Sequence, residues 1–220
     1  MSNFWIIVPV KDTRHSKQRL AESLTPDERQ TLAHAMLEDV LDAIAPLTQD
    51  VRCALVTIDD FARPQAERHD FRVIEAGAHD GHTGAVDGAR RVLAAEGAAG
   101  ILTLPGDIPL VTTGEIASVL AAHAQAPAFT IVPAEDELGS NAIACSPPLA
   151  VDLRFGDNSY YPHLDAARRA GIEPTIKRCP GIGVDIDVPA DLQRLLERDV
   201  ESRTRTAQYL RRLAHSGVPA

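Results

Sequence analysis

The sequence predicts a single α/β domain built on a mostly parallel, twisted sheet with helices on both faces. Short β-rich runs alternate with helical patterns through most of the 220 residues, and no repeat, long linker or low-complexity tract divides them. Hydrophobic residues make up 45% of the chain, which is enough for one sizeable core. In sheets of this kind ligands bind at the carboxyl ends of the strands, so polar residues directly after a strand are the first candidates for a site.

The expected strands are short apolar runs bounded by turn residues. The first begins at Phe4 and contains Trp5, the only tryptophan, which we expect in the core. The complete set of expected strands is 4–10, 53–58, 71–76, 100–104, 128–134 and 141–146.

The clearest helix start is at Thr25, which is a good N-cap. Pro26 suits the first helical position, and Glu28 completes a capping box. Further helices are expected over about 85–95, after the loop "GAHDGHTG", and over 115–124, 160–171 and 187–197. The arginine-rich segment that follows predicts one more helix, packed on the domain or on a second subunit. We therefore divide the chain into a main domain, 1–196, and a helical extension, 197–220, and we predict a homodimer that uses this extension.

The charge balance and the cysteines indicate the class of protein. A net charge of -9 argues against a nucleic-acid partner, although a local basic cluster can still bind a small anion. No apolar run approaches a membrane span, which argues against a membrane partner, and the first residues lack the pattern of a signal peptide. The three cysteines are far apart and odd in number, as in reduced core residues. These observations predict a cytoplasmic location.

The stretch "LTLPGDIPL" delivers Asp107 to the end of an apolar strand. A carboxylate there is costly unless it is paired or binds a metal ion, but position alone fits a turn or a helix cap equally well. A second acidic segment, "GVDIDVPADL", changes this balance. Asp185 and Asp187 stand at alternate positions and face one side of an extended segment, which suggests a shared cation. A helix start would make Asp187 an N-cap, and Asp191 fits such a capping role, but Asp185 would then be unexplained.

A basic cluster, "VPVKDTRHSKQRL", follows the first strand in a chain that is acidic overall. A loop between a strand end and a helix start is a usual place for phosphates, although a solvated helix face is the alternative. The loops "GHTG", "LGSNA" and "RFGDNSYYPH" offer glycine beside Ser, Thr or Asn, which lets a ligand approach the backbone. His82 and His163 in these loops are expected to be surface or helix-end residues.

These segments together resemble the CofC/FbiD guanylyltransferases, which make the precursor of the deazaflavin coenzyme F(420). The resemblance rests on "VPVK", "SKQRL", "AMLEDVL", "LPGDIPL", "GSNAI", "FGDNS" and "VDIDVPADL", which follow in the family's order over residues 6–196. It implies a Rossmann-like nucleotide-diphospho-sugar transferase fold for the main domain. It also implies that GMP passes from GTP to a small phosphorylated carboxylic acid, with release of pyrophosphate.

The resemblance also implies roles for individual residues. The metal-binding aspartates would be Asp107, Asp185 and Asp187, with Mg²⁺ as the cofactor, and the catalytic residues would be Lys11, Lys17 and Asp107. The acceptor acid would be held by Ser140, Gly156 and Ser159, with Ser140 standing where the family usually has Thr. Nucleotide contacts are expected from the basic cluster, from the middle loop "GHTG" and from the strand end in "LTLPGDIPL". They are Lys11, Arg14, Lys17, Arg19, Gly81, Thr83, Gly84 and Asp107. The middle loop departs from the family, because "GHTGA" replaces the usual "GLNxA" and Thr83 replaces its Asn.

Three acids fit the expected reaction, namely 2-phospho-L-lactate, phosphoenolpyruvate and 3-phosphoglycerate, and the sequence does not choose between them. A related nucleotidyltransferase with a sugar phosphate or a molybdopterin-type acceptor is the alternative, but the chain lacks the glycine-rich "GxGxR" opening of the usual forms. A non-catalytic nucleotide-binding subunit is the third class. Three retained candidate metal carboxylates argue against it.

Overall fold

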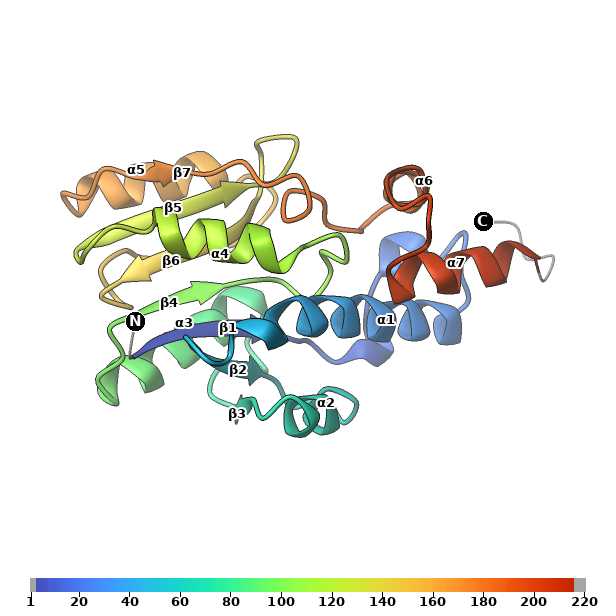
Figure 1. Cartoon of the computed structure of the whole chain (residues 1–220), viewed down its shortest axis with the longest axis horizontal. Coiled ribbons are helices and arrows are strands. Elements are labelled where there is room, and N and C mark those ends of the chain that lie inside the picture. The colour runs from blue at the N-terminus through green and yellow to red at the C-terminus, as the bar shows by residue number, and fades with distance from the viewer. Residues whose placement is uncertain (1–2, 216–220) are drawn as a thin grey trace.

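The computed structural model describes residues 3–215, and it confirms an α/β fold built on one mixed sheet of seven strands (Figure 1). Met1 and Ser2 in the chain's opening and residues 216–220 of the predicted extension lie outside the described residues. The strand order is β3-β2-β1-β4-β6-β5-β7. All neighbouring strands are parallel except that β6 runs antiparallel to both β4 and β5, so the sheet is mostly parallel as predicted.

The expected strands are all present, with ends within a few residues of the prediction. They are β1 (Phe4–Pro9), β2 (Arg52–Val56), β3 (Arg72–Ile74), β4 (Gly100–Thr103), β5 (Ala128–Pro133) and β6 (Ser140–Ser146). The short edge strand β7 (Thr175–Ile176) was not predicted, because two residues carry no periodic pattern.

The helices also follow the prediction with a few differences. They are α1 (Pro26–Ile44), α2 (Ala62–Arg68), α3 (Gly81–Ala95), α4 (Thr113–Ala122), α5 (Tyr160–Arg169), α6 (Pro189–Arg198) and α7 (Arg205–His215). Thr25 caps α1 with the predicted capping box. The helix α2 was not predicted, and α6 is capped at Val188 rather than at Asp187.

The segment "GHTG" is the first turn of α3 and not the predicted loop. Gly81 has a φ of +72°, a left-handed conformation that favours glycine and lets the chain turn into the helix. A Cβ on Gly88 would lie 2.2 Å from the Ala76 carbonyl oxygen. The glycines therefore serve close packing of α3 on the preceding turn.

Two apolar layers cover the two faces of the sheet, and β1 supplies both by alternation. Phe4 and Ile6 pack with α1 and α4, whereas Trp5 and Ile7 pack with α3 and α5. Trp5 is 8% exposed, which confirms its place in the core. The three cysteines are free and buried, as expected.

The last two helices lie beyond the carboxyl ends of the parallel strands (Figure 1). A third apolar cluster joins Leu32 and Met36 of α1 to Leu195 of α6 and Leu210 of α7. The hydroxyl of Thr206 also donates to Asp39 of α1, at 2.6 Å. The extension thus packs on the chain's own α1, while the domain boundary at residue 196 and the homodimer stay predictions.

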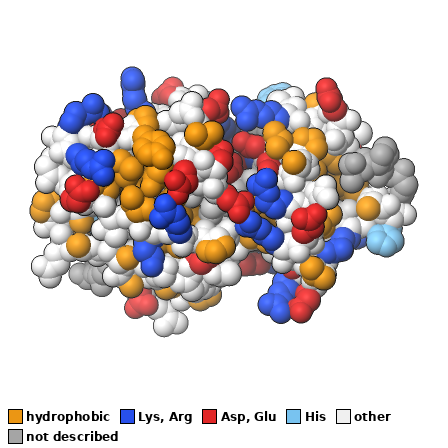
Figure 2. All heavy atoms as spheres, turned by 90° about the horizontal axis from the view of Figure 1, so that it is seen from above, with side chains coloured by type: hydrophobic (Ala, Val, Ile, Leu, Met, Phe, Trp, Pro, Cys, Tyr) orange, Lys and Arg blue, Asp and Glu red, His pale blue; other side chains and the backbone are white. Residues whose placement is uncertain are grey.

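The surface seen in Figure 2 carries basic and acidic side chains interleaved with one another. Hydrophobic side chains gather over the end of this face where α5 and β7 lie. No described helix is long and apolar enough to cross a bilayer.

Candidate active site

The carboxyl ends of β1 and β4 and the first residues of β6 meet at one edge of the sheet. β6 starts there because it runs antiparallel to β4, with Thr103 opposite Ile143. Lys11 and Lys17 follow β1, Asp107 follows β4, and Ser140 opens β6. The topology therefore brings together segments that are far apart in the sequence, as the rule for α/β sheets predicts.

A cleft of about 630 Å³ opens at this edge, which is within the usual size range of a small-molecule site. Its polar lining includes five of the predicted site residues. They are Lys11, Lys17, Gly81, Asp107 and Asp187. Ala33, Met36 and Leu37 of α1 supply an apolar part of the wall.

The centre of the site is the ammonium group of Lys17, which lies between two carboxylates. Its Nζ is 2.5 Å from Asp107 Oδ2 and 2.8 Å from Asp187 Oδ1. The side chain of Lys17 is 7% exposed, and its backbone has a φ of 53°, which is uncommon for a residue other than glycine. The loop after β1 thus holds a strained residue whose charge is delivered to the acidic pair.

The charges in this cluster shift one another's pKa. Burial lowers the pKa of Lys17, but the charges of Asp107 and Asp187 outweigh burial, and the net shift is upward. For Asp107, burial raises the pKa, and the Lys17 ammonium reverses the shift to a net lowering. Lys17 and Asp107 therefore stay ionised at neutral pH.

Asp185 completes the acidic group. Burial and then the charge of Asp107 raise its pKa, and the Asn141 amide donates to its Oδ1 at 3.1 Å, which partly opposes them. The backbone N–H of Ile186 donates to the Asp107 carbonyl at 3.1 Å, which fastens the two acidic segments together. Asp191 accepts from the N–H groups of Asp187 and Val188 at 2.9 and 2.8 Å, as its predicted capping role requires.

These residues fit a magnesium ion in their chemistry. No three His, Cys, Asp or Glu side chains of residues 3–215 converge as a ready-made metal cage. Mg²⁺, however, is usually held by one or two carboxylates together with substrate phosphates. The Lys17 ammonium marks a position where Asp107 and Asp187 already enclose one positive charge.

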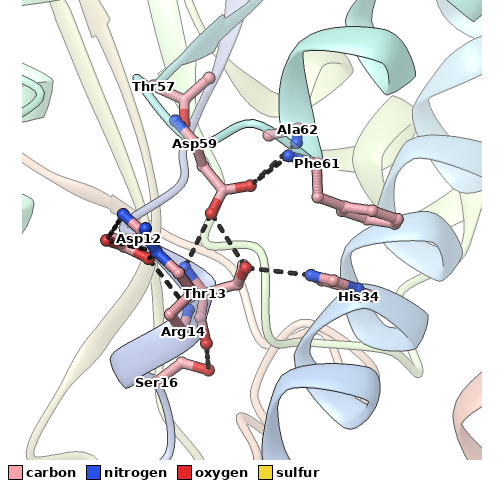
Figure 3. A network of polar contacts seen from close by, with 9 residues as sticks. All are labelled: Asp12, Thr13, Arg14, Ser16, His34, Thr57, Asp59, Phe61 and Ala62. Atoms are coloured by element: carbon pink, nitrogen blue, oxygen red, sulfur yellow. Dashed lines mark hydrogen bonds and ion pairs between the residues drawn. The ribbon is translucent and has the colours of Figure 1, made fainter. Parts of the chain in front are cut away.

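The loop that carries both lysines is anchored by Asp59, which follows β2 (Figure 3). Thr13 donates to Asp59 Oδ2 through its N–H and its hydroxyl, at 2.8 and 2.9 Å. The other oxygen accepts from the N–H groups of Phe61 and Ala62 at the start of α2. Asp59 and Thr13 were not predicted, because only the fold brings the two strand ends together.

Arg14 and Arg19 do not line the cleft. The Arg14 guanidinium donates to Asp12, and its side chain is 68% exposed. Arg19 Nη2 lies 3.7 Å from Asp157 Oδ1. Their predicted contact with the nucleotide stays a prediction.

Thr83 and Gly84 do not line the cleft either. The Thr83 hydroxyl accepts from the Phe155 N–H at 3.0 Å and contacts the Phe155 carbonyl at 3.3 Å. Thr83 thus ties α3 to the loop that carries Gly156. Its predicted nucleotide contact also stays a prediction.

None of the three predicted acceptor residues lines the cleft, but Ser140 and Ser159 contact each other next to a partner of the acidic group. Ser140 precedes Asn141, the partner of Asp185, and the hydroxyl of Ser159 donates to Ser140 at 3.2 Å. A Cβ on Gly156 would meet no atom within 4 Å, and Gly156 does not have a positive φ. Neither packing nor backbone conformation requires glycine at this exposed position.

His163, predicted to be a surface or helix-end residue, lies in the first turn of α5 but is not at the surface. It is 1% exposed, and burial lowers its pKa to about 4. Its Nδ1 lies 3.0 Å from Ser140 Oγ, and its Nε2 accepts from the Arg154 N–H at 2.9 Å. His82, in contrast, lines the cleft and also has a pKa lowered by burial to about 4.

Comparison with known families decides the class of this protein. The family model described as "Guanylyl transferase CofC like" matches residues 4–219. The chain belongs to this family. It is therefore a nucleotidyltransferase.

Two relatives in the family show what similar chains do. The chain is 34% identical over 193 residues to a phosphoenolpyruvate guanylyltransferase from Rubrobacter xylanophilus, with 86% of this chain and 91% of the relative covered. It is 30% identical over 214 residues to a 2-phospho-L-lactate guanylyltransferase from Methanothermobacter thermautotrophicus, with 97% and 92% covered.

Solved structures agree on the fold of this family member. A candidate nucleotide-diphospho-sugar transferase from Desulfovibrio desulfuricans G20 superposes with a TM-score of 0.75 at 21% identity, covering 98% of this chain and 96% of its own. At this identity the likeness shows the fold alone. It confirms the nucleotide-diphospho-sugar transferase fold that the sequence predicted.

Proposed function

We propose that this protein transfers GMP from GTP to a small phosphorylated carboxylic acid in the biosynthesis of coenzyme F(420). The observation that carries the proposal is the position of Lys11, Lys17, Asp107 and Asp187 at one cleft, in a chain matched by the guanylyl transferase family over residues 4–219. The relatives' acceptors, phosphoenolpyruvate and 2-phospho-L-lactate, support an acceptor that carries both a phosphate and a carboxylate. Free, buried cysteines are consistent with a cytoplasmic enzyme.

In the proposed reaction an oxygen of the acceptor's phosphate attacks the α-phosphorus of GTP. A new P–O bond joins the acceptor to GMP, the bond to the β-phosphate breaks, and pyrophosphate leaves. The acceptor's phosphate is largely dianionic at neutral pH, since its second pKa is about 6, so no strong general base is required. The protein's task is to position the reactants and to neutralise charge.

The residues of the cleft, together with Asp185 and the Ser140–Ser159 pair, suit this division of work. Lys11 is exposed on the cleft wall and is available to the leaving pyrophosphate. The Lys17 ammonium is already desolvated between two carboxylates. A bound phosphate would be a third anion attracted to the same positive charge. Ser140, Ser159 and the backbone at Gly156 would hold the acceptor. Asp107, Asp187 and Asp185 would hold Mg²⁺, which neutralises phosphate charge when it is bound.

The proposal is tested by measuring pyrophosphate release from GTP, ATP, CTP and UTP with each of the three acids, with Mg²⁺ and with EDTA. We expect release only with GTP, one of the acids and Mg²⁺, and a product that carries one guanosine and one acid. Release with a sugar phosphate in place of all three acids would favour the related nucleotidyltransferase instead. Nucleotide binding without turnover of any acceptor would contradict the proposal.

A further inference from the structure

His163 is hydrogen-bonded to Ser140, one of the three residues that would hold the acceptor, and to the segment that leads to Gly156. It projects from the first turns of α5, and its two ring nitrogens contact two different segments. One contact reaches Ser140 at the start of β6, and the other reaches the backbone of Arg154, two residues before Gly156. Because the ring is buried, these two contacts fix its orientation.

The partner of each nitrogen determines the tautomer. The Arg154 N–H can only donate, so Nε2 carries the lone pair. A neutral imidazole then has its hydrogen on Nδ1, which donates to Ser140 Oγ. The burial that lowers the pKa of His163 to about 4 keeps the ring neutral at physiological pH.

Ser140 consequently accepts two hydrogen bonds. One comes from His163 Nδ1–H at 3.0 Å, and the other comes from the Ser159 hydroxyl at 3.2 Å. A serine oxygen has two lone pairs, and both are now used. The hydrogen of Ser140 itself contacts no acceptor among residues 3–215, so the hydroxyl is left as a donor.

We propose that His163 is a positioning residue for the acceptor, because it forces Ser140 to present its hydroxyl hydrogen to the anionic acid and holds the loop that carries Gly156. The inference rests on the proposed function, since it assigns Ser140 to the acceptor. A hydroxyl that would otherwise rotate is preset as a donor, which suits a carboxylate or a phosphate oxygen. A group of the bound molecule that donates a hydrogen bond would find no free lone pair on Ser140 Oγ.

The first test measures the tautomer directly in the wild-type chain. Two-bond ¹H–¹⁵N correlation spectra of uniformly ¹⁵N-labelled protein at pH 7.5 distinguish the two neutral tautomers, and H163Q assigns the signal. We expect a neutral ring protonated at Nδ1. A ring protonated at Nε2, or a charged ring, would overturn the inference.

The second test is a double-mutant cycle on the acceptor's KM, with S140A, H163Q and the double variant. The amide oxygen of the introduced glutamine can replace Nε2 toward the Arg154 N–H, but the donor to Ser140 is lost. We expect H163Q to raise the acceptor's KM about tenfold with the KM for GTP unchanged, as for a lost hydrogen bond to a charged group. We also expect no further rise when H163Q is added to S140A. H163N is the matched control, because its amide nitrogen can replace Nδ1, and it should retain a lower acceptor KM than H163Q.

The outcomes separate this inference from the proposed function. A wild-type chain that turns over none of the acids contradicts the proposed function, and the acceptor role of His163 fails with it. An active wild type whose H163Q variant keeps the acceptor's KM, or raises both KM values alike, contradicts only the inference. Additive effects of S140A and H163Q would also overturn it, because His163 would then act independently of Ser140.

Discussion

Replacing Lys17 by Met should destabilise the protein in the absence of a divalent cation. The Lys17→Met variant keeps the apolar stem and removes the ammonium that lies 2.5 Å from Asp107 and 2.8 Å from Asp187. Two carboxylates are then left without their counter-charge, beside Asp185, whose pKa is already raised by burial and by the charge of Asp107. The variant therefore converts a balanced cluster into an excess of negative charge.

The size of the effect follows from the exposure of the three side chains. Breaking a fully buried ion pair by removing one partner costs about 3–5 kcal/mol. Lys17 is 7% exposed, but Asp107 and Asp187 are 31% and 46% exposed and remain partly solvated. We therefore expect a loss of about 2 kcal/mol in the free energy of unfolding. For a chain of this size that corresponds to a decrease of roughly 4–8 °C in Tm.

The assay is thermal unfolding of the wild type and Lys17→Met at pH 7.5, with EDTA and with Mg²⁺. We expect Mg²⁺ to raise the Tm of the variant more than that of the wild type, because Asp107 and Asp187 are released from the ammonium. A Kd of ~1 mM would give the variant about 1.4 kcal/mol at 10 mM Mg²⁺. Lys177→Met is the matched control, since Lys177 lies beside β7 and does not line the cleft, and it should leave both responses unchanged. A Lys17→Met variant as stable as the wild type in EDTA, with an equal response to Mg²⁺, would refute the reasoning.

Three further predictions concern the residues around this cluster. Asp191→Ala should lower the unfolding free energy by about 1 kcal/mol and reduce kcat, because the N–H groups of Asp187 and Val188 lose their acceptor. Thermal unfolding and initial rates check this. An unchanged kcat would show that the cap at Asp191 does not affect the site. Gly156→Ala should change the free energy of unfolding by less than ~0.5 kcal/mol but raise the acceptor's KM, since only a ligand would meet the added methyl. An unchanged KM would argue against an acceptor site at Gly156. His163 is neutral in the fold with a pKa of about 4, below its ordinary 6.5, so its contribution is complete above pH 6.5 and is lost as the pH falls toward 4. Urea unfolding from pH 7.5 to 4.5 should show a steeper loss in the wild type than in His163→Gln, by up to about 3 kcal/mol, and parallel curves would contradict the assignment.

Most of the fold could be predicted from the sequence because local patterns decide it. The apolar run of β1 and the capping box at Thr25 are local signals, and both elements begin where the sequence predicts. The start of α3 was missed because two glycines in "GHTG" resemble a loop. Their packing reason, such as the contact a Cβ on Gly84 would make with Asp80 at 2.3 Å, exists only in three dimensions. The helix α2 was missed for a different reason: its cap at Asp59 is local, but its seven residues are too few to show an apolar period.

The candidate site could be predicted in its residue types but not in its pairing. A carboxylate after an apolar strand is visible in the sequence, and Asp107 was found in this way. Nothing local shows that Lys17 turns its ammonium onto Asp107 and Asp187, because this contact joins residues 90 and 170 positions apart. His163 lies near a helix end, one of the two places predicted for it, but its burial could not be predicted, since a lone histidine on a helix gives no sign of whether tertiary packing will bury it.

Asp107 is the residue on which the proposed nucleotidyl transfer depends most. The most direct measurement compares pyrophosphate release from GTP, Mg²⁺ and the preferred acid by the wild type, Asp107→Asn and Asp165→Asn, the last an exposed aspartate on α5 that serves as control. We predict that Asp107→Asn is slower by about 10²–10³-fold while its circular dichroism spectrum is unchanged, and that Asp165→Asn behaves as the wild type. Near-normal release of pyrophosphate by Asp107→Asn would contradict this role of Asp107.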